Sequence, residues 1–174
     1  MMYLRKAVFS DLPRISAIID GAKAALKERG VNQWQAGDPS ESQFENDIRQ
    51  EYCYILIKDD TIVGVASIVD TVDDGYSAIT NGDWQSVASS HPYYSIHRMA
   101  LDGSVRGQHL AHQLMTLLIT AASIDGAHDV RIDTHPDNLA MQHVIQKAGF
   151  TYCGDILIAD DPSPKRFAYQ LVLK

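Results

Sequence analysis

The sequence predicts a mixed α/β fold in which helices flank a central β-sheet. Short runs rich in β-branched and aromatic residues alternate with segments whose apolar residues recur at helical spacing. Apolar residues make up 45% of the 174 residues and charged residues 21%, which is typical of a globular domain with its own core. Because no repeat, low-complexity tract or second core interrupts this pattern, we expect residues 1–174 to form one domain.

The first half of the chain is expected to hold two helices and a hairpin after an opening strand. Ser10 is a suitable cap for the first helix, and Gly30 is a suitable end for it. Asp59 and Asp60 lie between two β-rich runs and indicate a tight hairpin turn. The expected strands are 3–7, 53–57 and 61–69, and the second helix is expected over 42–49.

A long polar segment, residues 70–94, separates this half from a second series of alternating elements. Loops of this length are uncommon in compact domains and are often functional. Trp84, Tyr93 and Tyr94 are expected to cover a small core within it. The expected elements that follow are a strand at 93–101, a helix at 108–123, a strand at 130–134, a helix at 138–148, and strands at 151–157 and 166–173.

Charge and composition exclude several classes of function. Fifteen basic and twenty-two acidic residues give a net charge of -7, which disfavours a nucleic-acid partner. No apolar stretch reaches the roughly 20 residues that a membrane span requires, and no apolar leader is seen. Cys53 and Cys153 match no metal-ligand spacing, so we expect no metal and two free thiols. These features favour a cytoplasmic protein.

Two segments have the composition of a binding site. The loop 102–107 joins a strand to a helix, whose N-terminus offers unpaired N–H groups and the positive end of the helix dipole to an anion. Arg106 adds a full positive charge beside it. Alone, this pattern favours a structural loop. The second segment, 138–150, begins with Asn138, which is able to cap its helix or to contact a ligand, and ends in Gly149.

Taken in order, the two segments resemble the GCN5-related N-acetyltransferase (GNAT) family. Arg106–Ala111 is similar to the family's pyrophosphate-binding motif, and Asn138–Phe150 is similar to its second signature. The resemblance covers nearly the whole chain. It implies a mostly antiparallel twisted sheet with two splayed parallel strands. It also implies a bacterial enzyme, for which a homodimer is a reasonable expectation. The implied activity is transfer of an acetyl group from acetyl-CoA to a primary amine of a small molecule or peptide.

The resemblance also implies which residues bind the coenzyme. The backbone around Met99 and Leu101 would bond the pantetheine amides, and the N–H groups of 107–111 would hold the pyrophosphate. Asn138 would contact the pantetheine arm, with Met141 on the same face of its helix. The full set is Met99, Ala100, Leu101, Arg106, Gly107, Gln108, His109, Leu110, Ala111, Asn138 and Met141.

Two residues depart from the family pattern. His109 stands where the family has a glycine, and we expect it to adopt a helical φ. Ile145 stands where many members place a tyrosine that protonates the leaving thiolate. Tyr152 is a candidate for that role, although its position favours a half-buried strand tyrosine with a packing role. Both departures motivate an alternative function, a catalytically silent CoA-binding or regulatory domain.

A general base is required because a substrate amine is mostly protonated near neutral pH. The candidates are His97, Asp133 and His135, and His97 is favoured because an unperturbed imidazole titrates near neutrality. Strand alternation predicts that His97, Met99 and Leu101 share one face. A main-chain N–H near Met99 would stabilise the oxyanion. The insert at 70–94 is expected to form part of the acceptor-site wall.

Overall fold

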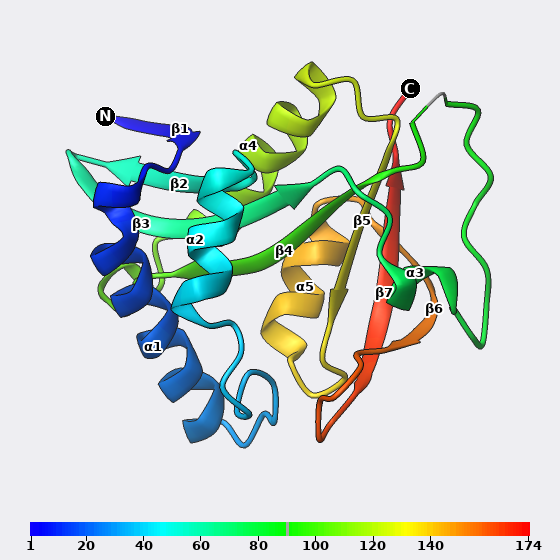
Figure 1. Cartoon of the computed structure of the whole chain (residues 1–174), viewed down its shortest axis with the longest axis horizontal. Helices are drawn as coiled ribbons and strands as arrows, with labels where there is room; N and C mark the ends of the chain where they lie inside the picture. Colours follow the sequence, from blue (N-terminus) through cyan, green and yellow to red (C-terminus); the bar gives the residue numbers. More distant parts are fainter. Residues whose placement is uncertain (90) are drawn as a thin grey trace.

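A seven-stranded, mostly antiparallel sheet with helices on both faces forms the centre of the molecule (Figure 1). The structure is a computed structural model that describes residues 1–89 and 91–174; Ser90, inside the predicted insert, lies outside the described residues. The strand order is β1-β2-β3-β4-β5-β7-β6, and β4 and β5 run parallel to each other. The predicted fold class is confirmed.

The observed elements begin and end within two residues of the predicted ones. A single-turn helix in the insert, α3, is not predicted. The strands are β1 (Met2–Lys6), β2 (Cys53–Lys58), β3 (Thr61–Val69), β4 (Tyr94–Leu101), β5 (Asp129–Thr134), β6 (Thr151–Leu157) and β7 (Lys165–Val172). The helices are α1 (Leu12–Glu28), α2 (Glu41–Arg49), α3 (Asp74–Ser77), α4 (Leu110–Ile124) and α5 (Leu139–Lys147).

Helix α1 ends as predicted but begins differently. Gly30 takes a left-handed φ of 71°, and the N–H of Val31 bonds the carbonyl of Leu26 at 3.0 Å, which closes the helix. At the other end a short 3₁₀ turn (Phe9–Asp11) precedes the helix, so Ser10 lies within that turn. The prediction that Ser10 caps α1 is wrong.

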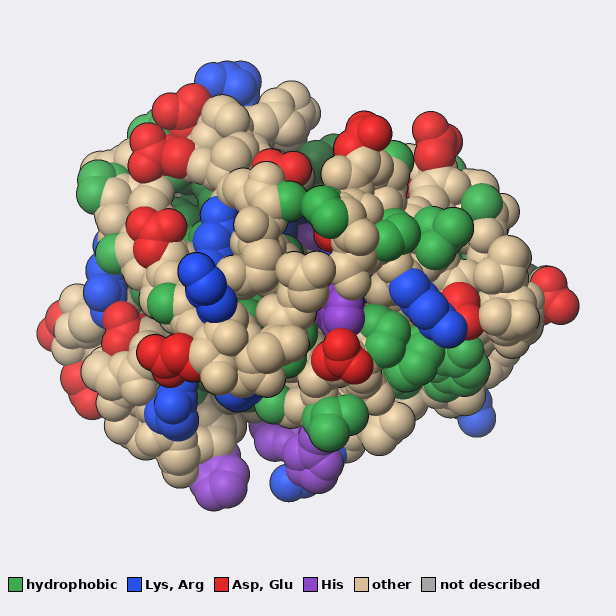
Figure 2. All heavy atoms as spheres, turned by 90° about the horizontal axis from the view of Figure 1, so that it is seen from below, with side chains coloured by type: hydrophobic (Ala, Val, Ile, Leu, Met, Phe, Trp, Pro, Cys, Tyr) green, Lys and Arg blue, Asp and Glu red, His purple; other side chains and the backbone are tan. Residues whose placement is uncertain are grey.

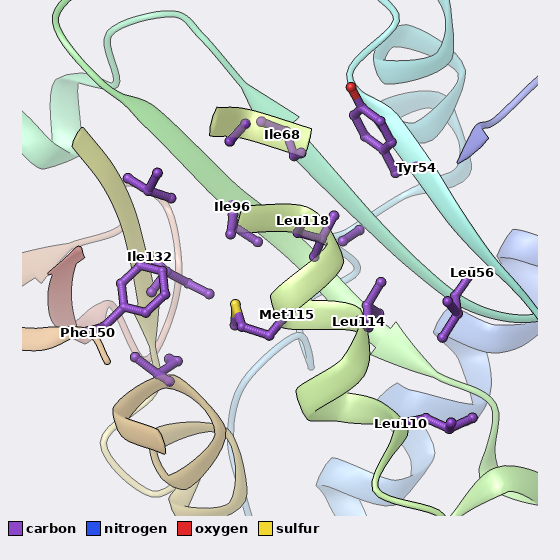
Figure 3. Packing of buried hydrophobic residues seen from close by; sticks show 14 of the residues in the cluster. Tyr54, Leu56, Ile68, Ile96, Leu110, Leu114, Met115, Leu118, Ile132 and Phe150 are labelled. Carbon is purple, nitrogen blue, oxygen red and sulfur yellow. The ribbon is translucent and has the colours of Figure 1, made fainter. Parts of the chain in front are cut away.

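Two apolar cores lie on opposite faces of the sheet. Helices α1 and α2 cover one face, where Ile15, Phe44 and Ile55 are among the buried residues. Helix α4 covers the other, and Figure 3 shows Leu114, Met115 and Leu118 of this helix directed toward the strands. No helix in the described part of the chain is long and apolar enough to cross a membrane.

The insert between β3 and β4 has a third core of its own. Tyr76, Tyr93 and Trp84 pack there on residues of β6 and β7, in part as predicted. The guanidinium of Arg131 on β5 lies between the Trp84 and Tyr93 rings, at 4.1 and 4.0 Å from their centroids. Tyr94 was expected in this core but packs on the α4 side instead. The insert therefore covers part of the sheet that neither α1 nor α2 reaches (Figure 1).

Close backbone contact holds the insert on β6. Thr80 and Asp155 bond each other's main chain at 2.9 and 2.8 Å. A Cβ added at Gly154 would lie 2.6 Å from the carbonyl oxygen of Thr80, a distance that side-chain carbons do not tolerate. Gly154 is therefore required for this approach.

We expect Gly154→Ala to lower the free energy of unfolding by about 1–3 kcal/mol, because the new methyl group overpacks against backbone. Gly21→Ala is the matched control: nothing lies within 4 Å of the added Cβ on α1, so alanine should raise stability by up to about 1 kcal/mol. Urea unfolding measures both. Equal effects of the two substitutions would contradict the proposed contact.

Candidate functional site

The sheet opens between its two parallel strands. Pairing of β4 with β5 joins Tyr94 to Val130, Ser95 to Arg131 and Ile96 to Ile132, and goes no further among the described residues. Beyond Ile96 the two strands diverge (Figure 1), so backbone groups on their facing edges have no strand partner. These groups are available to a ligand that enters the opening.

A β-bulge lies where β4 leaves β5. Arg98 has a left-handed φ of 54°, and the register with β3 shifts between Val65 and Ser67. As a result Met99 and Leu101 pack on the α4 side with Ile96, whereas Ala100 packs on the α1 side. His97 stacks on Tyr76 of the insert, on the side away from α4. The prediction that His97 shares a face with Met99 and Leu101 is wrong, because the bulge interrupts the alternation.

A buried ion pair fixes the bulge. Asp47 on α2 is 3% exposed and accepts hydrogen bonds from Arg98 Nε at 2.8 Å and from Ser67 Oγ at 2.5 Å. Sequence reasoning missed both members of this pair. The sequence feature that indicates such a pair is a lone carboxylate, Asp47, on the apolar face of α2 with Phe44 and Ile48.

The loop before α4 concentrates N–H groups. Gly107 and His109 both have positive φ, 81° and 57°, while Gln108 between them does not. Alternating signs of φ turn N–H groups toward one point and form a concavity suited to an anion. The N–H of Gln108 bonds the carbonyl of Val105 at 3.3 Å, so the donors of this concavity are the neighbouring N–H groups and those of the first turn of α4. Our expectation of a helical φ at His109 is wrong: the residue is the left-handed N-cap of α4, which begins at Leu110.

A cavity of about 1120 Å³ runs from this loop through the opening in the sheet. Nearly all of the residues predicted to bind the coenzyme line it. The lining members are Met99, Ala100, Leu101, Arg106, Gly107, His109, Leu110, Ala111, Asn138 and Met141.

Two predicted site residues do not line the cavity. The Gln108 side chain bonds Lys58 in the β2–β3 hairpin and so supports the loop from outside. Tyr152 lies on β6, is 46% exposed and donates to Asp155 at 2.9 Å. Burial of its ring and the Asp155 carboxylate raise the pKa of Tyr152 to about 12. The prediction that Tyr152 replaces the family tyrosine is therefore not supported by its position.

Asn138 connects two walls of the cavity. Its Oδ1 accepts the N–H of Met141 at 3.3 Å, as a helix cap does, and its Nδ2 donates to Gln33 Oε1 at 2.9 Å. Gln33, in the loop between α1 and α2, is buried. One N–H of the Asn138 amide remains for a ligand.

Asp133, near the end of β5, is a partly buried carboxylate on the side of the opening away from α4, with a side chain that is 11% exposed. It accepts the Tyr76 hydroxyl at 2.7 Å, and Arg166 Nε lies 4.0 Å from its other oxygen. Burial raises the pKa of Asp133, although the Tyr76 hydrogen bond and the Arg166 charge oppose the shift. A carboxylate in this setting is a better proton acceptor than an exposed aspartate.

The two histidine candidates for the general base are poor proton acceptors. Burial, with a smaller effect of the Arg98 charge, lowers the pKa of His97 to about 3. Its Nε2 lies 2.8 Å from Ser95 Oγ. His135 lies outside the cavity lining; its Nε2 contacts Ser163 Oγ at 2.8 Å, and burial lowers its pKa as well.

Other histidines gather near the start of α4. Figure 2 shows a group of histidine side chains along the lower edge of the molecule, while acidic side chains are spread over the rest of this face. The rings of His112 and His143 are 5.9 Å apart. Among the described residues, no three His, Cys, Asp or Glu side chains are arranged to hold a metal ion.

Comparison with known proteins decides the family. The model of the acetyltransferase (GNAT) family matches residues 20–150. The chain belongs to the GNAT family. A GNAT acetyltransferase from Streptococcus agalactiae is 30% identical with a TM-score of 0.89, over 99% of this chain and 96% of that one. The search of curated proteins found no match to this chain.

More distant GNAT structures share the fold. The ribosomal-protein-S18-alanine N-acetyltransferase from Escherichia coli is 16% identical (TM-score 0.69; 100% of this chain, 95% of that one). A ribosomal L7/L12 alpha-N-protein acetyltransferase in complex with coenzyme A is 19% identical (TM-score 0.68; 99% and 94%). GNAT family members use acetyl-CoA. The open strand edges, the N–H concavity and Arg106 fit that group, because they offer donors to amide and phosphate oxygens.

We expect His109→Gly to raise the free energy of unfolding by about 0.5–1 kcal/mol, because glycine adopts the left-handed φ without a steric penalty. His109→Val should lower it, because a β-branched residue tolerates this φ poorly. Thermal denaturation of the three proteins gives the order. A stability of His109→Val at or above that of the wild type would contradict the left-handed conformation.

Proposed function

We propose that this GNAT protein is an acetyl-CoA-dependent N-acetyltransferase that acetylates a primary amine of a small molecule or peptide. The observation that carries the proposal is the continuity of the cavity. It begins at the N–H concavity before α4, passes through the opened sheet, and reaches a partly buried carboxylate, Asp133, on the other side. A donor of acetyl groups and an amine can thus approach each other from opposite sides of the sheet.

Asp133 is the proposed general base. It replaces His97 in this role, because an imidazole with a pKa near 3 is a weak proton acceptor at neutral pH. Asp133 would take the proton of the acceptor ammonium as the free amine forms. Tyr76 holds the carboxylate in place through its hydroxyl.

The remaining steps require little from side chains. Acetyl-CoA supplies an activated acetyl group as a thioester. A main-chain N–H near Met99, on the open edge of β4, would donate to the acetyl oxygen as negative charge develops there. Ile145 is fully buried in the core and cannot protonate the leaving thiolate, whose pKa of about 8–9 lets it leave near neutral pH with limited help.

We extend the proposal to the architecture of the enzyme. Residues 1–174 would act as one domain, and the insert at 70–94 would form one wall of the acceptor site. Support for the second point is that residues 71–74 line the cavity beside Asp133's partner Tyr76. The bacterial sources of the similar structures support a bacterial enzyme.

Arg106→Ala is expected to weaken acetyl-CoA binding by about tenfold or more, because a charge-assisted contact to phosphate is lost. Isothermal titration calorimetry measures the affinity. Arg49→Ala, at the end of α2 and outside the cavity lining, is the control with the same change of net charge. Absence of binding by the wild type would overturn the proposal. Binding without acetylation of any amine would favour the silent CoA-binding domain.

Asp133→Asn should lower kcat/KM by about 10²–10⁴-fold while leaving acetyl-CoA affinity unchanged, because the amide accepts no proton but still accepts the Tyr76 hydrogen bond. Because the ionised carboxylate is the active form, activity should fall as pH decreases through the raised pKa of Asp133. Steady-state pH profiles check this. In His97→Gln the acid limb should stay where it is, because His97 is already neutral there.

Tyr76→Phe tests whether Asp133 acts as the base or has only a structural role, because it changes the pKa of Asp133 without removing the carboxylate. Loss of its hydrogen bond to the ionised form should raise the pKa of Asp133 further and move the acid limb to higher pH. An unmoved limb in this variant, together with near-normal activity of Asp133→Asn, would rule out Asp133 as the base.

A further inference from the structure

Carboxylates from three segments line the side of the cavity away from α4. The segments meet at Asp133, because Tyr76 of the insert donates to it and Arg166 of β7 lies beside it. Arg166 also bonds Asp161 at 2.5 Å, which brings the turn between β6 and β7 to the same place. The lining carboxylates that these three segments supply are Asp73 and Asp74 of the insert, Asp133 of β5, and Asp160 and Asp161 of the turn.

Positive charge on this side is scarcer than negative charge: of its three lining arginines, Arg98 and Arg166 are paired with carboxylates, and the exposed Arg29 bonds the carbonyl of Ala25. Over the whole described lining there are eight aspartates, four arginines and no lysine or glutamate. Arg98 is held by Asp47 at 2.7 Å, and Arg166 by Asp161. In contrast Asp74 and Asp160 are exposed and have no hydrogen-bond or ion-pair partner within the described chain. The acceptor side therefore carries surplus negative charge that faces the cavity.

One carboxylate is sufficient for the chemistry of a single amine. In the proposed function Asp133 receives the proton of the reacting ammonium, and no second carboxylate is needed for that step. A cavity lined by one sign of charge concentrates ligands of the opposite sign and repels ligands of its own. The additional negative charge of Asp74 and Asp160 would therefore attract a part of the acceptor other than the reacting amine.

We infer that the acceptor carries a second positive charge near the amine that is acetylated. This inference rests on the proposed function and defines its substrate class. A free aliphatic diamine and a peptide with a basic side chain after its N-terminal amine both have this chemistry. An acceptor with a carboxylate near its amine is disfavoured by the same field.

Three amines with a four-carbon chain test the inference: putrescine, butylamine and γ-aminobutyrate. With saturating acetyl-CoA, kcat/KM should be about tenfold higher for putrescine than for butylamine and lowest for γ-aminobutyrate. The preference for putrescine should shrink as salt concentration rises, because ions screen the field. The dipeptides glycyl-arginine and glycyl-glutamate, both with an amidated C-terminus so that neither carries a terminal carboxylate, form a second arm. Preference for glycyl-arginine, without acetylation of putrescine, supports the inference with a peptide as the source.

The double variant Asp74→Asn, Asp160→Asn should reduce kcat/KM for putrescine, or for glycyl-arginine in the peptide case, by about tenfold. Asparagine is suited to position 160, whose φ is 60°. Asp20→Asn with Asp83→Asn is the matched control, since both residues are exposed, lie outside this cavity and change the net charge equally. The control should lose less than about twofold.

The outcomes separate this inference from the proposed function. Equal rates with the three amines and the two dipeptides, or equal losses in the two double variants, overturn the inference and leave acetyl transfer intact. Acetyl-CoA binding without acetylation of any of these amines overturns the proposed function, and the inference with it.

Discussion

In β4, the bulge at Arg98 places two residues, Arg98 and Met99, opposite the single residue Ala66 of β3. A bulge bends its strand and increases the local twist, so β4 turns away from β5 and the sheet opens. A non-glycine residue at this φ costs about 1–3 kcal/mol. The buried pair with Asp47 holds it there, and loss of one partner of such a pair costs about 3–5 kcal/mol. Helix α2 thus fixes the opening as well as covering the sheet.

Opening the sheet connects two faces that differ in charge. On the α4 face, N–H groups around Gly107 and His109 and the charge of Arg106 suit phosphate oxygens. On the other face, the insert and the β6–β7 turn supply carboxylates around Asp133. An anionic donor and a cationic acceptor are therefore each disfavoured on the wrong side. In the proposed reaction this charge distribution would orient both reactants.

The sequence was sufficient for what depends on local pattern. Helical periodicity and β-rich runs gave the elements, and the two ordered segments gave the family and most of the cavity lining. It failed where long-range packing overrides local preference. The bulge at Arg98 depends on Asp47, 51 residues away. It places Met99 and Leu101 on the face opposite to His97, where simple alternation predicted one shared face. Tyr152 is near α5 in sequence, yet β6 is the far edge strand and lies outside the cavity.

Asn138 shows how the two halves of the site are joined. Its cap to Met141 fixes it to α5, on the coenzyme side, while its Nδ2 binds Gln33 in the loop that links α1 to α2. Because Gln33 and Trp34 line the cavity as well, a ligand that uses the remaining Asn138 N–H contacts a residue whose position the α1–α2 loop sets. The sequence interval of 105 residues between Gln33 and Asn138 hides this contact. The N-terminal third of the chain is therefore a structural part of the proposed coenzyme site, although both sequence signatures lie beyond residue 100.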